Sequence, residues 1–308
     1  MRAYYCHHFE LPLPEGHRFP MAKYGRLYAR VRAATERLGI QLSEPEPISR
    51  QDLERVHCPA YVARVFEGRL SASEQRRIGF PWSSAMVERS RRSVGGTLAA
   101  VCAALDDGTA VNLAGGTHHA GFDRGAGYCV FNDVVVALRA AQQRGLLRRA
   151  LIVDLDVHQG DGSAALCAQD PSIYTLSIHS QRNYPAIKPP SDLDIGLPDG
   201  TSDAAYLDHL AAALPRALQA ARPDMVVYLA GADPFVGDKL GHLALSKAGL
   251  AERDRQVVQS SRDHGLPLAM CMAGGYAEQV DDIVDIHFAS VQCAARYARR
   301  PAGQGQAD

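Results

Sequence analysis

From residue 110 onwards, short apolar runs alternate with segments of helical periodicity. The runs are almost wholly apolar, which is typical of parallel strands covered on both faces. They lie at 110–113, 150–156, 173–178, 224–230 and 267–273. The helical segments lie between or after them, at 132–144, 161–168, 204–221, 246–264 and 277–298. This alternation predicts a single α/β domain built on a central parallel sheet.

The first third of the chain is less regular. Three segments there have helical periodicity, at 21–38, 49–66 and about 83–105. Pro59 interrupts the second of them, because proline disrupts a helix interior. The polar stretch 67–82 is predicted to be a loop, and residues 3–6 fit a short first strand.

Composition and charge narrow the function classes. The 308-residue chain has a formal charge of -1, so no bulk attraction to nucleic acid or acidic membranes is expected. No apolar run reaches the ~18–20 residues of a membrane-spanning helix, and the N-terminus lacks the apolar core of a signal peptide. The cysteines form no C-x-x-C pair, which argues against a thiolate metal site. We therefore expect a cytoplasmic protein without direct nucleic acid binding or a membrane span.

Unusual polar and glycine-rich segments follow four of the predicted strands. In open α/β sheets, binding sites form at the carboxyl ends of strands. The four segments are 115–119, 154–162, 231–234 and 274–276. Each alone could be an ordinary turn, but all four are expected at one edge of one sheet. The sequence therefore predicts a shared site at this edge.

Carboxylates and an imidazole in two of these segments suggest a metal site. Asp154, Asp156 and His158 alternate after an apolar run, so on a continuing strand they would share one side. Burying such groups is costly unless a metal or hydrogen-bond partner compensates. Asp156, His158 and Asp233 can supply three ligands and leave positions open, as in catalytic sites. This ligand set suits Zn(II), with Fe(II) and Co(II) as alternatives. The structural alternatives are a turn at Asp233 and a packed core histidine at His158.

Acid–base chemistry is available from the adjacent pair His118 and His119. Each imidazole needs a partner to hold its tautomer, and Asp154 and Asp161 are free to orient one histidine each. Asp161 could instead cap the following helix. Tyr276 follows two glycines, and its phenol could donate to a developing oxyanion, with ordinary packing as the alternative.

These segments together resemble one family, the metal-dependent histone deacetylases and their bacterial relatives, which include acetylpolyamine amidohydrolases. The matching segments occur in the family's order, at 115–120, 127–133, 154–162, 232–238 and 274–276. Four further features resemble the class IV branch of that family. They are Gln159 after the metal-binding histidine, the insertion 123–125, and the segments 16–24 and 237–241.

The resemblance implies the arginase/deacetylase fold, with about eight parallel strands between helical layers, although the pattern alone reveals five or six. It places one catalytic domain at residues 1–300, followed by a tail at 301–308 that is predicted to be disordered. Zn(II) would be bound by Asp156, His158 and Asp233.

The resemblance also implies catalytic roles. His118 would pair with Asp154 and act mainly through its charge, while His119 would pair with Asp161 and act as general base and acid. Tyr276 would polarise the acyl carbonyl.

Two further sites are implied in the same way. Gly127, Tyr128 and Tyr184 match positions that line the substrate tunnel of relatives. A K+ ion would lie beside the metal, held partly by backbone carbonyls of the segment 154–158, and Ser177 matches a side-chain ligand of that ion.

The expected activity is removal of an acetyl or longer fatty acyl group from acyl-lysine in a protein or peptide, or from a related acylated amine. The class IV likeness favours long acyl groups. One alternative is an acetylpolyamine amidohydrolase, although the near-neutral charge argues against an acidic entrance for polyamines. A second alternative is an arginase-like ureohydrolase, which needs two metals, and Asp238 does not complete a second ligand pair. A non-catalytic acyl-lysine-binding protein is the alternative of a different class.

Overall fold

A computed structural model of the chain describes residues 1–298. Eight strands form one sheet, in the order β2-β1-β3-β8-β7-β4-β5-β6, and every pairing is parallel. The strands are β1 (Arg2–Tyr4), β2 (Gln41–Ser43), β3 (Thr109–Asn112), β4 (Ala150–Asp154), β5 (Ile173–Ser180), β6 (Leu193–Leu197), β7 (Met225–Leu229) and β8 (Leu268–Cys271). The predicted α/β class is confirmed, as is the total of eight strands that the family resemblance implied.

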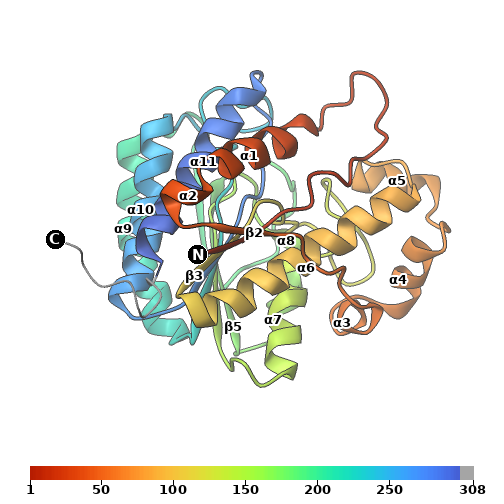
Figure 1. Cartoon of the computed structure of the whole chain (residues 1–308), viewed down its shortest axis with the longest axis horizontal. Coiled ribbons are helices and arrows are strands. Elements are labelled where there is room, and N and C mark those ends of the chain that lie inside the picture. The colour runs from red at the N-terminus through yellow and green to blue at the C-terminus, as the bar shows by residue number, and fades with distance from the viewer. Residues whose placement is uncertain (299–308) are drawn as a thin grey trace.

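Helices cover both faces of the sheet. In Figure 1, α9, α10 and α11 lie on one side and α6 and α7 on the other, while α3, α4 and α5 form a lobe beside α6. The helices are α1 (Ala22–Ala33), α2 (Thr35–Leu38), α3 (Arg50–Glu54), α4 (Pro59–Phe66), α5 (Ala72–Ile78), α6 (Ser84–Asp107), α7 (Asp133–Gln143), α8 (Asp161–Cys167), α9 (Asp203–Ala221), α10 (Lys247–Asp263) and α11 (Val280–Tyr297). The layers therefore bury the sheet from both sides, as the apolar runs require.

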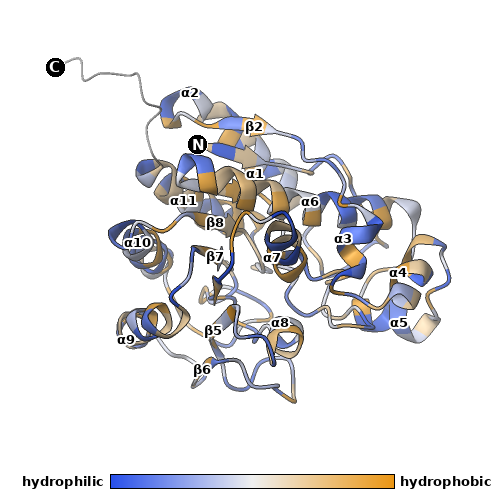
Figure 2. Cartoon of the chain, turned by 90° about the horizontal axis from the view of Figure 1, so that it is seen from below, coloured by the Kyte–Doolittle hydropathy of each residue, from blue (hydrophilic) through white to orange (hydrophobic). Residues whose placement is uncertain are grey.

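Two hydrophobic cores lie on opposite faces of the sheet. Every residue of the central strands β4, β7 and β8 is buried, and their side chains alternate between the two cores. In Figure 2 the helices around the sheet carry both hydrophobic (orange) and hydrophilic (blue) positions, as expected for helices buried on one face. Within residues 1–298, no helix is long and apolar enough to cross a membrane.

The strands that the pattern did not reveal are short or lie at a sheet edge. β2 has three residues and β6 alternates between half-buried and exposed positions, so neither gives a long apolar run. The predicted loop at 67–82 was wrong, because α5 lies inside it. Ser71 and Glu74 form a capping box that begins this helix, a signal that was present in the sequence.

Two predicted helices are divided. The segment 21–38 contains α1 and α2, and Ala34 between them leaves helical geometry. The segment 49–66 contains α3 and α4, and Pro59 begins the second helix instead of interrupting one. The tail at 301–308 lies outside the described residues.

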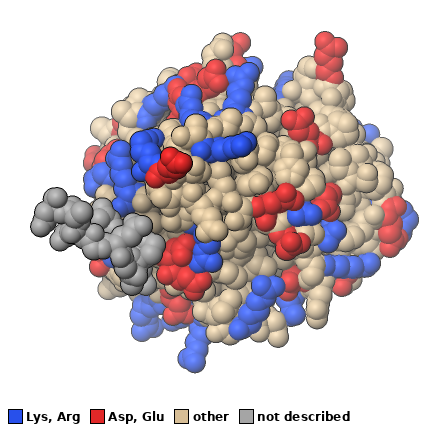
Figure 3. Space-filling view, in the orientation of Figure 1, with Lys and Arg blue, Asp and Glu red and all other residues tan. Residues whose placement is uncertain are grey.

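The strand that precedes the metal motif is shorter than predicted. β4 ends at Asp154, so Asp156 and His158 lie in the loop after it and do not share one side of a strand. The surface gives no sign of one dominant charge, because positive and negative side chains are interspersed over the face in Figure 3. This agrees with the near-neutral formal charge.

Candidate metal centre and active site

Three buried side chains meet at the carboxyl edge of the sheet. Asp156 and His158 follow β4, Asp233 follows β7, and these strands are neighbours. One ligand atom from each residue lies within 4.8 Å of the other two. His158 Nδ1 lies 3.0 Å from Asp156 Oδ1 and 3.4 Å from Asp233 Oδ2. The structure therefore brings together all three predicted ligands, and no other such group exists within residues 1–298.

The surroundings of this cluster fit a metal cation. Asp233 Oδ1 accepts a hydrogen bond from Val157 N at 2.9 Å, but the buried Oδ2 has no hydrogen-bond partner. Gly274 N donates to Asp156 Oδ2 at 2.8 Å. A Cβ atom at position 274 would lie 1.9 Å from Asp233 Oδ2, so only glycine leaves this oxygen free. Two carboxylates and one imidazole without thiolate are a donor set that suits zinc.

The electrostatics of the cluster are those of a cation site. Burial and the neighbouring Asp156 raise the pKa of Asp233 to about 7. Burial opposes the charge on His158, but Asp156 and Asp233 raise its pKa to about 10. The carboxylates thus attract positive charge strongly, and a metal would compete with a proton for this place.

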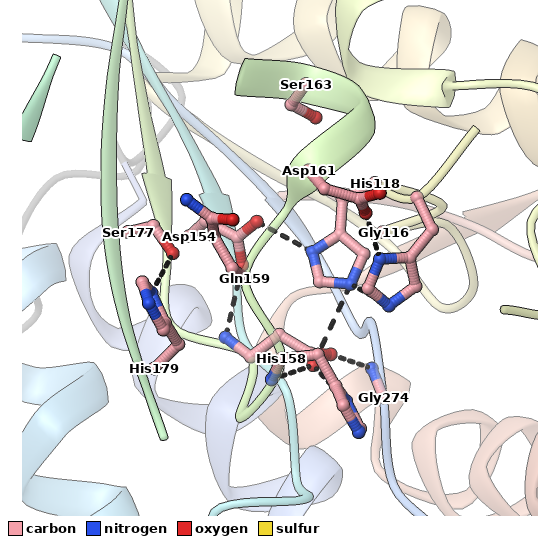
Figure 4. A network of polar contacts seen from close by, with 12 residues as sticks. Gly116, His118, Asp154, His158, Gln159, Asp161, Ser163, Ser177, His179 and Gly274 are labelled. Carbon is pink, nitrogen blue, oxygen red and sulfur yellow. Dashed lines mark hydrogen bonds and ion pairs between the residues drawn. The ribbon is translucent and has the colours of Figure 1, made fainter. Parts of the chain in front are cut away.

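Each histidine of the predicted acid–base pair has its own carboxylate (Figure 4). His118 Nδ1 lies 2.7 Å from Asp154 Oδ2, and His119 Nδ1 lies 2.6 Å from Asp161 Oδ1. The two Nε2 atoms are 3.1 Å apart. Although Asp161 begins α8, its side chain is directed to His119, which is the predicted pairing and not a helix cap.

The two imidazoles differ in charge. Burial would lower the pKa of His118, but Asp154 and Asp156 raise it to about 9. Burial and the positive charge of His118 lower the pKa of His119 to about 4. At neutral pH, His118 therefore carries the proton and His119 is free to accept one.

Tyr276 lies beside the cluster without a hydrogen bond to it. Its ring centroid is 6.5 Å from that of His158 and 5.7 Å from that of Tyr128. Its backbone N donates to Asp238 Oδ2 at 2.6 Å, which fixes the loop after β8. Burial and the charge of Asp156 raise the pKa of the phenol well above its usual value. The hydroxyl therefore keeps its proton and can donate it in a hydrogen bond.

The predicted tunnel residues gather around His119. Gly127 has φ +52°, and a Cβ atom there would lie 2.6 Å from His119 Cδ2. Tyr184 is 45% exposed, and its ring meets His119 edge-on, with centroids 4.8 Å apart. A cavity of about 40 Å³ is bordered by His119, Gly127, Tyr128 and Tyr276. Gly127 and Tyr128 thus border a small cavity next to His119, while Tyr184 packs against the His119 ring from an exposed position.

The histone deacetylase domain model matches residues 17–291, which is most of the chain. The chain belongs to the histone deacetylase family.

Three relatives illustrate the range of similar proteins. An uncharacterized protein of Picosynechococcus sp. is 46% identical over 276 residues, covering 90% of this chain and 92% of that protein. Histone deacetylase 2 of Arabidopsis thaliana is 33% identical over 250 residues, covering 76% of this chain and 62% of the plant protein. A probable deacetylase of Methanothermobacter thermautotrophicus is 29% identical over 291 residues, covering 87% and 83%. The family and the two relatives named as deacetylases support deacetylation as the general reaction.

The crystal structure of the HDA15 HD domain has the same architecture. It aligns with a TM-score of 0.79 and 21% identity, covering 95% of this chain and 90% of that chain. At this identity the likeness supports the fold alone, which is the histone deacetylase fold expected from the sequence.

Asp238 is engaged away from the metal cluster. Its carboxylate accepts hydrogen bonds from the backbone N of Leu240, Gly241 and Tyr276 at 2.6–3.0 Å. It positions the loop that carries Tyr276 and is not part of a second ligand pair. Nothing in the described residues therefore favours the arginase-like alternative.

Two predicted residues, Ser177 and Gln159, lie near Asp154 (Figure 4). Ser177 pairs with Asp154 in the β4–β5 register, and its hydroxyl lies 2.8 Å from His179 Nδ1. Gln159 Nε2 donates to Pro189 O at 2.7 Å and to Asp194 Oδ1 at 2.9 Å. Gln159 thus connects the loop after β4 to the loop that carries Tyr184. Sequence analysis had treated this residue only as a feature of the class IV branch. The K+ site near Ser177 stays a prediction.

Sequence reasoning missed a buried carboxylate that shapes the histidine pair. Asp133 is 0% exposed and accepts hydrogen bonds from Gly116 N at 3.0 Å and Thr117 N at 2.6 Å. Thr117 Oγ1 donates to the same carboxylate at 2.7 Å. Asp133 therefore fixes the turn before His118. The signal in the sequence was an aspartate directly before an apolar helical run.

Arg253 was also missed, although it is completely buried beneath the metal loops. Its Nη1 donates to Gly231 O at 2.7 Å and to Leu155 O at 3.2 Å. These carbonyls belong to the segments that carry Asp233 and Asp156, so one guanidinium joins the two strand ends that supply the candidate metal ligands.

Proposed function

We propose that the chain is a metal-dependent deacylase that hydrolyses the amide of an acylated primary amine, with acyl-lysine as the leading substrate. The observation that carries the proposal is the buried cluster of Asp233, His158 and Asp156, in which Asp233 Oδ2 accepts no hydrogen bond and lies 3.4 Å from His158 Nδ1. A buried carboxylate oxygen without a donor is costly unless a cation binds it. We take Zn(II) as the metal, with Fe(II) and Co(II) as alternatives.

The histidine pair supplies proton transfer. When bound, the metal polarises the acyl carbonyl and lowers the pKa of water. His119 Nε2 accepts the proton of the attacking water, because Nδ1 is held by Asp161 and the imidazole is neutral. The amide C–N bond then breaks, and His119 returns the proton to the leaving amine. His118 stays protonated beside Asp154, and its charge favours the developing oxyanion.

Tyr276 supplies a second stabilising group. Its phenol keeps its proton, so it can donate to the carbonyl oxygen as negative charge develops there. Gly127, Tyr128 and Tyr184 would guide the linear side chain of the substrate to this point. A K+ ion near Ser177 and the backbone of residues 154–158 would support the metal loop, and the class IV assignment rests on the sequence features above.

Chelation and substrate assays test the proposal. The purified protein is stripped with a chelator, reloaded with Zn(II), Fe(II) or Co(II), and assayed on acetyl- to myristoyl-lysine peptides and on acetylpolyamines. We expect turnover to disappear on chelation and return on reloading. His119→Ala should lower kcat about 10²- to 10⁴-fold without weakening zinc binding, while the exposed His209→Ala serves as control. Turnover that survives chelation, or near-wild-type activity of His119→Ala, would contradict the proposal.

A further inference from the structure

The loop 183–189 is closed on itself beside the acid–base pair. It carries Tyr184, whose ring packs against His119 with centroids 4.8 Å apart. Lys188 Nζ donates to two backbone carbonyls of the same loop, at 2.7 Å each. Because these contacts hold the loop together, a bond from one of its residues to another loop also restrains Tyr184. Asn183, directly before Tyr184, makes such bonds.

The buried side chain of Asn183 binds the loop 238–242 at two points. Its Nδ2 donates to Leu240 O at 2.6 Å, and its Oδ1 accepts from His242 N at 2.9 Å. The carboxamide thus acts like a backbone peptide group, because it pairs with the carbonyl of one residue and the amide of the second residue after it. An aspartate in this place would have no donor for the carbonyl at neutral pH. The arrangement therefore requires a carboxamide and not only a side chain of this size.

The loop 238–242 also fixes the backbone of Tyr276. Asp238 Oδ1 accepts from Leu240 N and from the next backbone N, at 2.8 and 3.0 Å. Its Oδ2 accepts from Tyr276 N at 2.6 Å. Asp238 also forms an isolated β-bridge with the residue after Tyr276. Hydrogen bonds therefore run from the Asn183 side chain, through this loop, to the backbone of Tyr276.

We propose that Asn183 is a positioning residue for the hydrolysis, which couples the loop of Tyr184 to the backbone of Tyr276. The inference rests on the proposed deacylase function. The Tyr184 ring packs against His119, and the Tyr276 ring lies beside that of His158. The two rings thus reach the site from different loops, and Asn183 fixes one loop relative to the other. Because a misplacement of about 1 Å at the reacting groups can cost about 10²-fold in rate, this fixed spacing supports turnover.

A double-variant cycle tests the coupling. The values of kcat and KM are measured on an acetyl-lysine peptide for the zinc-loaded wild type, Asn183→Ala, Tyr276→Phe and the double variant. We expect Asn183→Ala to lower kcat about 10-fold. Tyr276→Phe, which removes a donor to the oxyanion, should lower kcat about 10²-fold. If Asn183 acts through Tyr276, the double variant is no slower than Tyr276→Phe alone. A loss of about 10³-fold in the double variant, the product of the two single losses, would show independent effects and overturn the proposal.

Two further variants separate positioning from packing and from general destabilisation. Asn183→Asp keeps the size of the side chain but loses the donor to Leu240 O, so its kcat should match that of Asn183→Ala. Wild-type kcat in Asn183→Asp would mean that the side chain only fills space, and would overturn the proposal. Gln142→Ala is the matched control, because Gln142 Nε2 donates to Arg148 O at 3.0 Å and to Ser172 Oγ at 2.9 Å at the amino edge of the sheet. Its kcat should equal that of the wild type, and a loss as large as in Asn183→Ala would count against positioning.

Amide hydrogen exchange, followed residue by residue with NMR, detects the coupling without turnover. In Asn183→Ala, the amides of Leu240 and Tyr276 should exchange about 3- to 10-fold faster, the worth of one net hydrogen bond. The amides of the central strand β8 should keep their wild-type protection. Unchanged exchange at Tyr276 would overturn the coupling. If the wild type hydrolyses no acyl peptide, the deacylase function fails, and the exchange rates still decide whether Asn183 restrains Tyr276.

Discussion

Two buried charged groups lie close together at the carboxyl edge of the sheet. They differ in how far the chain itself supplies their hydrogen-bond partners. In the ion pair of Arg253 and Asp254, Asp254 Oδ1 accepts from Arg253 Nη2 at 2.8 Å and Nε at 3.0 Å, and Tyr228 and Ser290 donate their hydroxyls to the same carboxylate. Asp233, in the candidate metal cluster, is as deeply buried, yet its Oδ2 accepts no hydrogen bond and has only His158 Nδ1 nearby, at 3.4 Å.

The difference separates a structural charge from a functional one. A buried charge that is fully paired by the chain needs no ligand, and its contribution is made on folding. A buried charge left unpaired by the chain destabilises the fold until a ligand compensates it. Burial alone therefore does not identify a site, whereas burial combined with a missing partner does.

The largest expected effect comes from breaking the completed pair. Asp254→Asn leaves the Arg253 guanidinium buried without its counter-charge, and we expect a loss of about 3–5 kcal/mol of unfolding free energy. Urea unfolding measures this loss, and it should be the same with zinc and with chelator. A loss that appears only in the presence of zinc would show that Asp254 contributes to the metal site. It would contradict the view that the Arg253–Asp254 pair is purely structural.

The same Asp→Asn change at Asp233, in the candidate metal cluster, should raise the stability of the metal-free protein and not lower it. Because the pKa of Asp233 is raised to about 7, the folded chain holds this proton more tightly than the unfolded chain. Stability of the metal-free protein therefore falls as pH rises from about 4 to 7, and Asp233→Asn removes this loss. We expect the variant to be at least as stable as the wild type in chelator at pH 8.

Zinc binding by Asp233→Asn should be weaker by more than about 100-fold, since a ligand is worth at least as much as the outer groups that orient it. Competition with a chromophoric chelator measures this affinity. Unchanged zinc affinity would mean that the unpartnered oxygen does not mark a metal ligand.

The place of the site was predictable, but not every group that supports it. Parallel strands end at one edge, so the segments around His118, Asp156, Asp233 and Tyr276 could be expected to converge. The shared edge follows from the alternation of strands and helices, so it could be predicted without knowing where β4 ends. The prediction that Asp156 lies on one side of the strand required β4 to continue to residue 156, and it was wrong because β4 ends at Asp154.

The supporting groups were hidden because their partners are backbone atoms far away in the sequence. Asp133 binds the amides of Gly116 and Thr117, and Arg253 binds carbonyls that precede the predicted metal ligands. Residue types do not reveal such contacts, since every residue carries the same backbone groups. A short helix such as α5 failed for another reason, because its capping signal lies in a polar stretch without hydrophobic periodicity.

A buried histidine extends the comparison to a group that is paired but neutral. His57 Nδ1 donates to Gly121 O, Nε2 accepts from Asn132 N, and burial lowers the pKa to about 4. The unfolded chain therefore binds a proton that the folded chain excludes, and stability falls as pH drops from about 6.5 toward 4.

From a folded pKa of about 4 and an ordinary value of 6.5, this one residue should account for about 2 kcal/mol of lost stability between pH 7 and pH 5. His57→Gln keeps one donor and one acceptor without titrating, so its urea midpoint should depend less on pH. The exposed His209→Gln should follow the wild type. Equal pH dependence in all three proteins would show that acid acts elsewhere.

The smallest expected effect concerns zinc affinity, and it tests whether the Arg253–Asp254 pair also supports metal binding. Replacing both members in Arg253→Met/Asp254→Leu removes the charges together, so the loss of stability should be smaller than in Asp254→Asn, although the Tyr228 hydroxyl loses its acceptor. The carbonyls of Leu155 and Gly231 nevertheless lose their shared donor, and the two strand ends that carry the metal ligands are no longer joined. We therefore expect zinc affinity to fall about tenfold, in the range of groups that orient metal ligands.

Ser290→Ala is the matched control for this double variant, because Ser290 contacts Asp254 but neither carbonyl. Its zinc affinity should equal that of the wild type. If the double variant also binds zinc normally, Arg253 acts on folding alone, and the two charged groups are independent although they lie beneath the same loops. If affinity falls in the double variant only, the Arg253–Asp254 pair positions the loops that carry Asp156 and Asp233. The two groups then differ in whether the chain alone pairs their charges, but both contribute to zinc binding.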